Sequence, residues 1–209
     1  MANVDAPFGL RPVGHLLGLS WTDKVRPYYV PAGYATALFI GDPVIKVAGG
    51  SNTAVIKVPG AGSFGTGTLP EINKAAAGAT NRITGVIVGF SPLPTNLDVK
   101  HNPASTERVA HVCEDPYVIF AIQADSAGLV PAANIGVNAN LIFTHAGVVS
   151  TGLSGVELNS STEAADATFQ LLILRAVNVE DNDGELAHAR FEVLINLHTQ
   201  NPVAALGIA

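Results

Sequence analysis

The sequence predicts an all-β protein: a jelly-roll or β-barrel-like single domain with very little helix. The 209 residues include 21 Gly and 13 Pro, which separate short segments rich in β-branched side chains. No long segment repeats apolar residues with the period of a helix. No internal repeat or domain boundary is visible either. We therefore expect an extended N-terminal arm over residues 1–20 and one β domain over residues 21–209.

The clearest predicted strands lie in the C-terminal half. Residues 191–198 alternate apolar and polar side chains, the pattern of a strand with one buried face. Residues 169–179 are apolar at both odd and even positions, as in a strand covered on both faces, and one face could meet another subunit. Asp183 and Gly184 form a turn signal between the two segments. Together they predict a C-terminal β-hairpin.

The remaining elements are short. One helical turn is expected within residues 129–137, whereas residues 60–68 and 93–106 have the composition of surface loops. Further strands are predicted at residues 26–30, 42–47, 54–58, 82–90, 108–113, 117–124, 141–144 and 147–151.

The chain carries unusually little charge. Asp, Glu, Lys and Arg make up 13% of the residues, about half the share typical of a soluble domain. Residues 126–156 contain no formal charge, yet Pro131, Gly136 and several Asn residues interrupt them, and no run reaches the roughly 18 apolar residues of a transmembrane helix. The composition therefore predicts a protein whose surface is largely covered by other subunits, and no membrane insertion.

Charge and cysteine content exclude further classes. The net charge is −6 and the 11 Lys and Arg residues are scattered, so no basic stripe predicts direct binding to nucleic acid. Cys113 is the single cysteine, which rules out an internal disulfide. The first fourteen residues lack the basic cluster and apolar core of a secretory signal. We expect folding in a reducing cytoplasm.

Three residue patterns partly match known ligand sites. Gly60, Gly62 and Gly65 spell GxGxxG after a predicted strand, but no helix can follow, so a hairpin loop is favoured over a nucleotide site. The residues His111, Cys113, Glu114 and Asp115 crowd donor atoms but lack the second pair of a zinc site, and Cys113 is expected to be a small buried hydrophobe. The acidic run 180–185 departs from a calcium loop at both ends and predicts a solvated hairpin tip.

Two further features have structural and functional interpretations. Ser154 lies in no GxSxG elbow and is expected in a turn. Aromatic side chains concentrate near the N-terminus, where they could form a carbohydrate platform; attachment of the arm to the barrel or to a neighbour is the favoured interpretation. These residues are Trp21, Tyr28, Tyr29 and Tyr34.

Several segments, taken in order, resemble one family. They are APFGLRPV at residues 6–13, TALFIGDPV at 36–44, ITGVIVGFSP at 83–92, DPYVIFAIQAD at 115–125, IGVNANLI at 135–142, GVELNSST at 155–162 and ATFQLLILRAV at 167–177. In this order and spacing they resemble the head decoration, or capsid cement, proteins of tailed bacteriophages. The likeness is spread over the whole chain and contains no chemically diagnostic motif.

The resemblance implies a structural role. Such proteins bind the outer face of an assembled icosahedral capsid and bridge neighbouring major capsid protein subunits, so the expected partners are the major capsid protein and further copies of the chain, with a dimer favoured over a trimer. We expect no enzyme activity, no cofactor and no metal, synthesis in the host cytoplasm and a final location on the virion. Our hypothesis assigns capsid contact to Phe8, Leu10 and Arg11, and the subunit interface to Leu141 and Phe143.

Three alternatives remain open. A metal-dependent enzyme predicts stoichiometric zinc retained at His111 and Cys113. A different virion role, in the tail or as a shell subunit, predicts self-assembly without a partner. A carbohydrate-binding β module predicts glycan affinity that depends on Trp21 or Tyr28.

Overall fold

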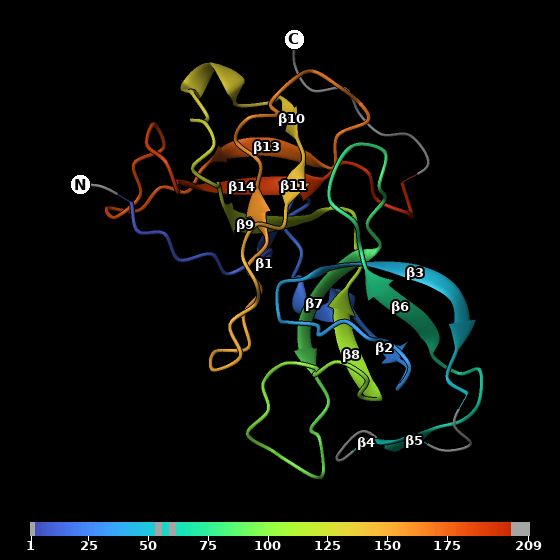
Figure 1. Ribbon diagram of the computed structural model, residues 1–209. Coiled ribbons are helices and arrows are strands. Elements are labelled where there is room, and N and C mark those ends of the chain that lie inside the picture. The colour runs from blue at the N-terminus through green and yellow to red at the C-terminus, as the bar shows by residue number, and fades with distance from the viewer. Residues whose placement is uncertain (1–2, 53–55, 59–61, 202–209) are drawn as a thin grey trace.

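The computed structural model describes residues 3–52, 56–58 and 62–201, and they form two stacked lobes (Figure 1). The upper lobe is built on a five-stranded sheet, and the lower lobe is a closed five-stranded barrel. Helical structure in the described ranges is limited to two short 3-10 helices, η1 (Thr22–Lys24) and η2 (Ala132–Asn134). The all-β prediction is confirmed, as is the helical turn expected within residues 129–137.

The upper lobe holds an antiparallel sheet in the order β1, β9, β14, β13, β10. The predicted C-terminal hairpin is confirmed, because β13 and β14 pair in antiparallel register with Leu172 opposite Leu194. A two-stranded sheet of β11 and β12 lies beside it. The bounds are β1 (Arg11–His15), β9 (Val118–Gln123), β10 (Asn138–Ala139), β11 (Leu141–Ile142), β12 (Glu157–Leu158), β13 (Leu171–Ala176) and β14 (Arg190–Ile195).

The lower lobe closes a barrel in the order β2, β6, β3, β7, β8, with β8 pairing back onto β2. The pairs are antiparallel except β2 with β6. A hairpin of β4 and β5 extends from the bottom of this lobe. The bounds are β2 (Val25–Val30), β3 (Pro43–Gly50), β4 (Ile56–Val58), β5 (Gly62–Phe64), β6 (Pro70–Lys74), β7 (Gly85–Phe90) and β8 (Arg108–Cys113).

The two lobes share one hydrophobic core. Phe120 and Phe191 from the inner face of the sheet belong to the same buried cluster as Val86 and Cys113 from the barrel strands. A second cluster, which includes Tyr28 and Ile72, fills the barrel itself. The lobes therefore fold as parts of one unit.

Residues 3–20 differ from the expected extended arm. Arg11–His15 forms β1 and pairs with β9 at the edge of the sheet, and a turn follows at residues 16–18. Leu10 is 1% exposed and lies in the shared core. Just before it, Gly9 has a φ of +72°, and a Cβ built there would lie 2.6 Å from the Gly41 carbonyl oxygen. The N-terminal segment is thus an integral part of the domain rather than an appendage at residues 1–20.

Other differences concern short elements. Residues 147–151 form turns instead of the expected strand, with a single bridge between Val148 and Leu153. The predicted strand at 54–58 is seen at Ile56–Val58, and residues 54 and 55 lie outside the described ranges. The strands β1, β5, β6, β10 and β12 had not been predicted. No helix within the described ranges has the length and apolar character needed to cross a membrane.

A buried carboxylate joins the barrel to the loop between β11 and β12. Asp42 is fully buried and accepts hydrogen bonds from the Ser154 hydroxyl, at 2.6 Å, and from the Phe39 N–H, at 2.8 Å. Its Oδ1 also lies 2.7 Å from the Lys74 ammonium. Ser154 is therefore a buried structural residue in this network.

A second buried charge organises the long loop between β7 and β8. Arg108 is 6% exposed and donates three hydrogen bonds to the main-chain carbonyls of Ser91, Val99 and His101. Burial lowers the pKa of this guanidinium. The loop expected at residues 93–106 is confirmed, and one side chain from β8 holds it in place.

Candidate functional site

The first candidate surface is an apolar groove on the outer side of the sheet lobe. Successive residues of a strand face opposite sides of a sheet, so Leu172 and Leu194 point away from the core that holds Ile173 and Val193. Both outward leucines are only half-buried. With Leu16 and Tyr117 they line a groove of about 250 Å³, which we call the outer groove. The strand expected within residues 169–179 is seen at Leu171–Ala176, but its second face is half-buried in this chain rather than covered.

Exposed hydrophobic side chains cluster beside the outer groove. Leu16 and Tyr117 are joined by a main-chain hydrogen bond of 2.8 Å, and their side chains are 51% and 50% exposed. Leu17 is 64% exposed on the same segment. Contiguous apolar surface of this kind is typical of interaction sites. The same N-terminal segment also carries the exposed hydrophobic residues Val13 and Leu19.

The sheet edge next to this cluster is irregular. β1 is an outermost strand, and a bulge interrupts its register between Pro12 and Gly14. Bulges and prolines at an edge discourage regular addition of another strand. A partner on this side would therefore contact side chains more than the backbone.

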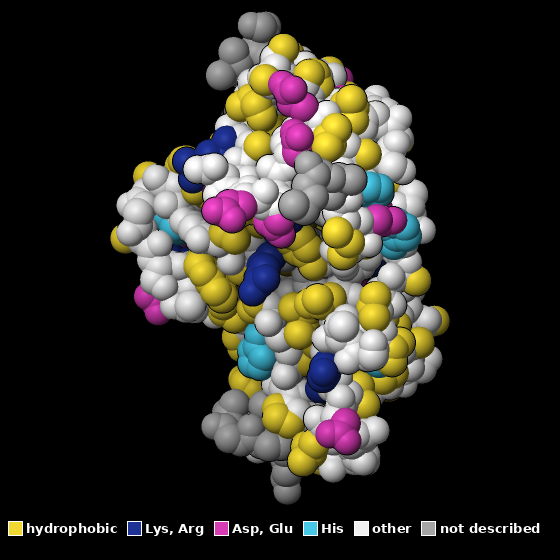
Figure 2. Space-filling view, turned by 90° about the vertical axis from the view of Figure 1, so that its left-hand side faces the viewer, with side chains coloured by type: hydrophobic (Ala, Val, Ile, Leu, Met, Phe, Trp, Pro, Cys, Tyr) yellow, Lys and Arg dark blue, Asp and Glu magenta, His cyan; other side chains and the backbone are white. Residues whose placement is uncertain are grey.

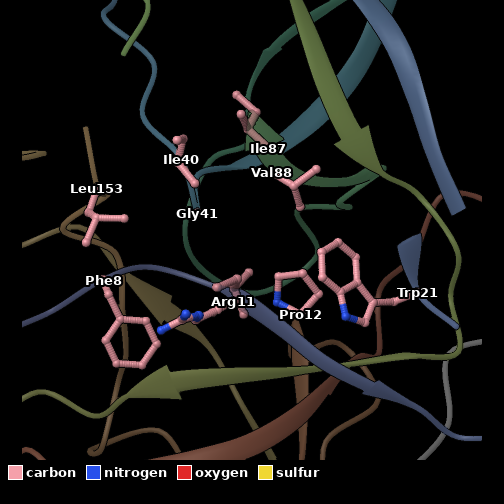
Figure 3. A pocket seen from close by; sticks show the side chains of 10 residues that line it. Phe8, Arg11, Pro12, Trp21, Ile40, Gly41, Ile87, Val88 and Leu153 are labelled. Carbon is pink, nitrogen blue, oxygen red and sulfur yellow. The ribbon is translucent and has the colours of Figure 1, made fainter. Parts of the chain in front are cut away.

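The second candidate surface is a cleft of about 370 Å³ where the lobes meet. Figure 3 shows Phe8, Arg11 and Pro12 on one side of this junction cleft and Ile40, Ile87 and Val88 on the other. Trp21 lies next to Pro12 at one end, and Leu153 lies at the other. In Figure 2, hydrophobic side chains gather around a basic one at this level of the molecule.

The three residues that our hypothesis assigns to capsid contact differ in their exposure. Phe8 is half-buried and Arg11 is exposed, and both line the junction cleft. Leu10 also borders the cleft, but its side chain is 1% exposed and packs in the shared core. A residue so enclosed offers almost no area to a partner, which leaves Phe8 and Arg11 as the contact candidates.

The two residues that our hypothesis assigns to the subunit interface also differ in their exposure. Leu141 is 2% exposed because it faces the shared core, so we withdraw it as an interface residue. Phe143 is half-buried, and the Lys74 ammonium lies 4.9 Å from the centre of its ring. Within the uncharged stretch 126–156, the exposed hydrophobic residues are Leu129, Val148 and Val149.

The possible metal ligands on and just after β8 do not come together into a metal site. The His111 ring nitrogen Nε2 lies 3.1 Å from the Ser91 hydroxyl, whereas Cys113 lies in the core. Burial raises the pKa of the Cys113 thiol to about 12, so it stays protonated at neutral pH. The prediction that Cys113 is a buried hydrophobe is confirmed. Glu114 instead accepts a hydrogen bond from the Tyr28 hydroxyl.

The other sequence features have structural roles. Tyr28 and Tyr29 are 2% and 1% exposed, so their rings are not available to stack on a sugar. The segment with the GxGxxG pattern lies in the hairpin of β4 and β5, but Gly62 begins strand β5 instead of lying in the expected loop, and Gly60 lies outside the described residues. The acidic residues of the 180–185 tip are exposed, as predicted, and the tip also hydrogen-bonds the side chain of Asn3.

Comparison of the chain with protein-family models, with curated proteins and with solved structures finds no match.

Proposed function

We propose that the protein is a structural virion protein that decorates an assembled icosahedral capsid and bridges neighbouring major capsid protein subunits. The observation that carries this proposal is the outer groove with its exposed leucines, in a chain that has few charges. A free monomer gains nothing from such a surface, whereas a protein covered by neighbours buries it. The segments that resemble decoration proteins supply the capsid as the partner.

The two candidate surfaces suit two different contacts. The outer groove is lined by Leu16, Tyr117, Leu172 and Leu194, and this apolar surface suits a two-fold contact between copies of the chain, with a three-fold contact as the second choice. The junction cleft combines Phe8 with the Arg11 guanidinium, which suits a capsid segment that carries an apolar side chain and a carboxylate. A dimer held through the groove would present two clefts and so bridge two capsid subunits.

Capsid stabilisation then follows from mass action. A ligand that binds only the assembled state shifts the equilibrium towards that state. Each copy needs only a modest binding free energy, because the contact repeats over the whole shell. The proposed function requires no chemical step.

The test is co-sedimentation with undecorated, expanded capsids of the cognate phage, together with the mass of the free protein by light scattering. We expect saturable binding by a small symmetric oligomer. Leu194→Asp should reduce the oligomer to a monomer, and Arg11→Glu should weaken capsid binding at least tenfold. Leu97→Asp is the matched control, since Leu97 is 76% exposed on the loop between β7 and β8 and lines neither surface.

The fluorescence of Trp21, the single tryptophan, can report on binding at the junction cleft. Trp21 lines the junction cleft, so capsid binding there should change its fluorescence, and Arg11→Glu should remove the change. Filaments without capsids would support a tail or shell role instead. A stable monomer that ignores capsids would overturn the proposal.

A further inference from the structure

Four side chains that are far apart in the sequence meet on the upper lobe. Asp5 Oδ2 lies 4.0 Å from His145 Nε2, and Asp5 Oδ1 lies 3.6 Å from His188 Nδ1. On its other side, His145 Nδ1 lies 3.0 Å from Glu157 Oε2. One ligand atom each from Asp5, His145 and Glu157 lie within 4.8 Å of one another, the one such grouping found among the described residues.

This cluster contains buried polar atoms without partners. Glu157 is fully buried, its carboxylate faces His145, and its Oε1 has no hydrogen-bond partner. His188 Nδ1, which faces Asp5, is also buried without one. Leaving a carboxylate oxygen buried and unpaired is costly. The unpartnered Glu157 oxygen belongs to a carboxylate that faces this cluster, and a positively charged ligand there would offset the cost of its burial.

Hydrogen bonds from one side chain fix the backbone around the cluster before any ion binds. The Gln123 side chain accepts a hydrogen bond from the Ala6 N–H and donates one to the Val4 carbonyl, so it fixes the chain on both sides of Asp5. The same amide nitrogen donates to the His188 carbonyl at 3.0 Å. One buried glutamine of β9 therefore positions two of the four groups, as a preorganised ligand site requires.

We propose that Asp5, His145 and Glu157 form a binding site for a divalent transition metal ion, with Zn²⁺ as its best representative, and that His188 lies beside this site against Asp5. One imidazole and two carboxylates supply three of the nitrogen and oxygen donors that zinc accepts, as in zinc sites that keep a fourth position open. Ca²⁺ and Mg²⁺ favour sites made of oxygen ligands alone, so the imidazole selects against them. Small side-chain movements would bring the donors to the roughly 2.0–2.2 Å that zinc ligands require.

The ion would act as a clip between two segments. Asp5 belongs to the N-terminal segment, and His145 and Glu157 belong to the loop and strand after β11. His188, beside the site, belongs to the connection between β13 and β14. Binding to the folded state alone would stabilise it by mass action. This inference does not depend on capsid binding.

The test is calorimetric titration of the chelator-treated full-length protein with ZnCl₂, and with CaCl₂ and MgCl₂ for comparison. We expect one Zn²⁺ per chain and no comparable binding of the other two ions. Asp5→Asn and His145→Gln should each weaken Zn²⁺ binding at least tenfold. Both side chains are nearly half exposed, at 47% and 43%, so these variants should fold normally.

Matched controls separate this site from adventitious binding. Asp23→Asn and His111→Gln change the same residue types elsewhere and should leave Zn²⁺ binding unchanged. Zinc should also raise the melting temperature of the wild type and of both controls, but not of His145→Gln. The proposal is overturned if the wild type binds no zinc, or if the controls weaken binding as much as the site variants do.

Discussion

The two lobes solve the problem of sheet edges in different ways. In the barrel every strand has a partner on both sides, and its interior is filled by its own side chains. The sheet of the upper lobe is open, with β1 and β10 as its outermost strands, and its outer groove leaves Leu172 and Leu194 half-exposed. Closure satisfies the backbone within one chain, whereas an open sheet leaves surface for neighbours. Both lobes contribute to the core, but the apolar groove that could meet a neighbour lies on the sheet.

The largest expected effect comes from breaking the joint between the lobes at Asp42. Asp42→Ala leaves the Lys74 ammonium, the Ser154 hydroxyl and the Phe39 N–H without their shared acceptor. We expect the free energy of unfolding to fall by about 3–5 kcal/mol, measured by urea denaturation. Asp98→Ala, on an exposed loop, should change it by less than about 0.5 kcal/mol. Equal effects would show that the joint contributes nothing specific.

A pair of neighbours on β13 sharpens the contrast between the two faces of the sheet. Ile173 is fully buried, and Ile173→Ala should lower the free energy of unfolding by about 2–5 kcal/mol. Leu172 is half-buried on the outer groove, and Leu172→Ala should cost about 1 kcal/mol in the dilute monomer. The measurement is urea denaturation at several protein concentrations. Equal losses at the lowest concentration would contradict the assignment of the faces.

The smallest expected effect is a pH dependence of the free energy of unfolding, which comes from His198 where the lobes meet. His198 is fully buried and forms an isolated β-bridge with Ile83, just before β7. Burial lowers the pKa of the His198 side chain from the usual 6.5. Below about pH 6.5 the unfolded chain takes up a proton that the folded chain does not, so stability falls as pH falls through this window. Above pH 6.5 the contribution is constant. His101 and His111 shift in the same direction through burial.

The measurement for this prediction is a pair of urea titrations at pH 7.5 and pH 5.5, with the His198 ring followed by NMR. We expect a lower unfolding midpoint at pH 5.5 and a His198 ring that remains neutral where a free histidine would already be half-charged. A His198 ring that titrates at or above pH 6.5 would contradict the assignment.

Strands with a clear apolar pattern could be predicted from the sequence, and those defined by tertiary contacts could not. The segments 108–113 and 191–195 are rich in β-branched or alternating residues, and both are strands. β1 contains Pro12 and Gly14, and β6 contains four half-buried residues, so their local signals are weak. They become strands because β9 and β3 lie beside them.

The candidate sites divide in the same way. An apolar second face for residues 169–179 was readable from the sequence, because it needs only two-residue periodicity. The burial of Leu10 and Leu141 was not readable, since an isolated leucine has the same local pattern on a surface and in a core. The cluster of Asp5, His145 and His188 has no spacing to recognise, because three separate loops bring it together.

The anchoring of the long barrel loop by Arg108 has a consequence for protein engineering. All three of its hydrogen bonds go to main-chain carbonyls, which every amino acid provides. The side chains at the exposed tip, residues 94–98, are therefore free to change or to be replaced by a foreign peptide while the base of the loop keeps its shape. On a shell covered by many copies, that tip would be a natural place to display an epitope.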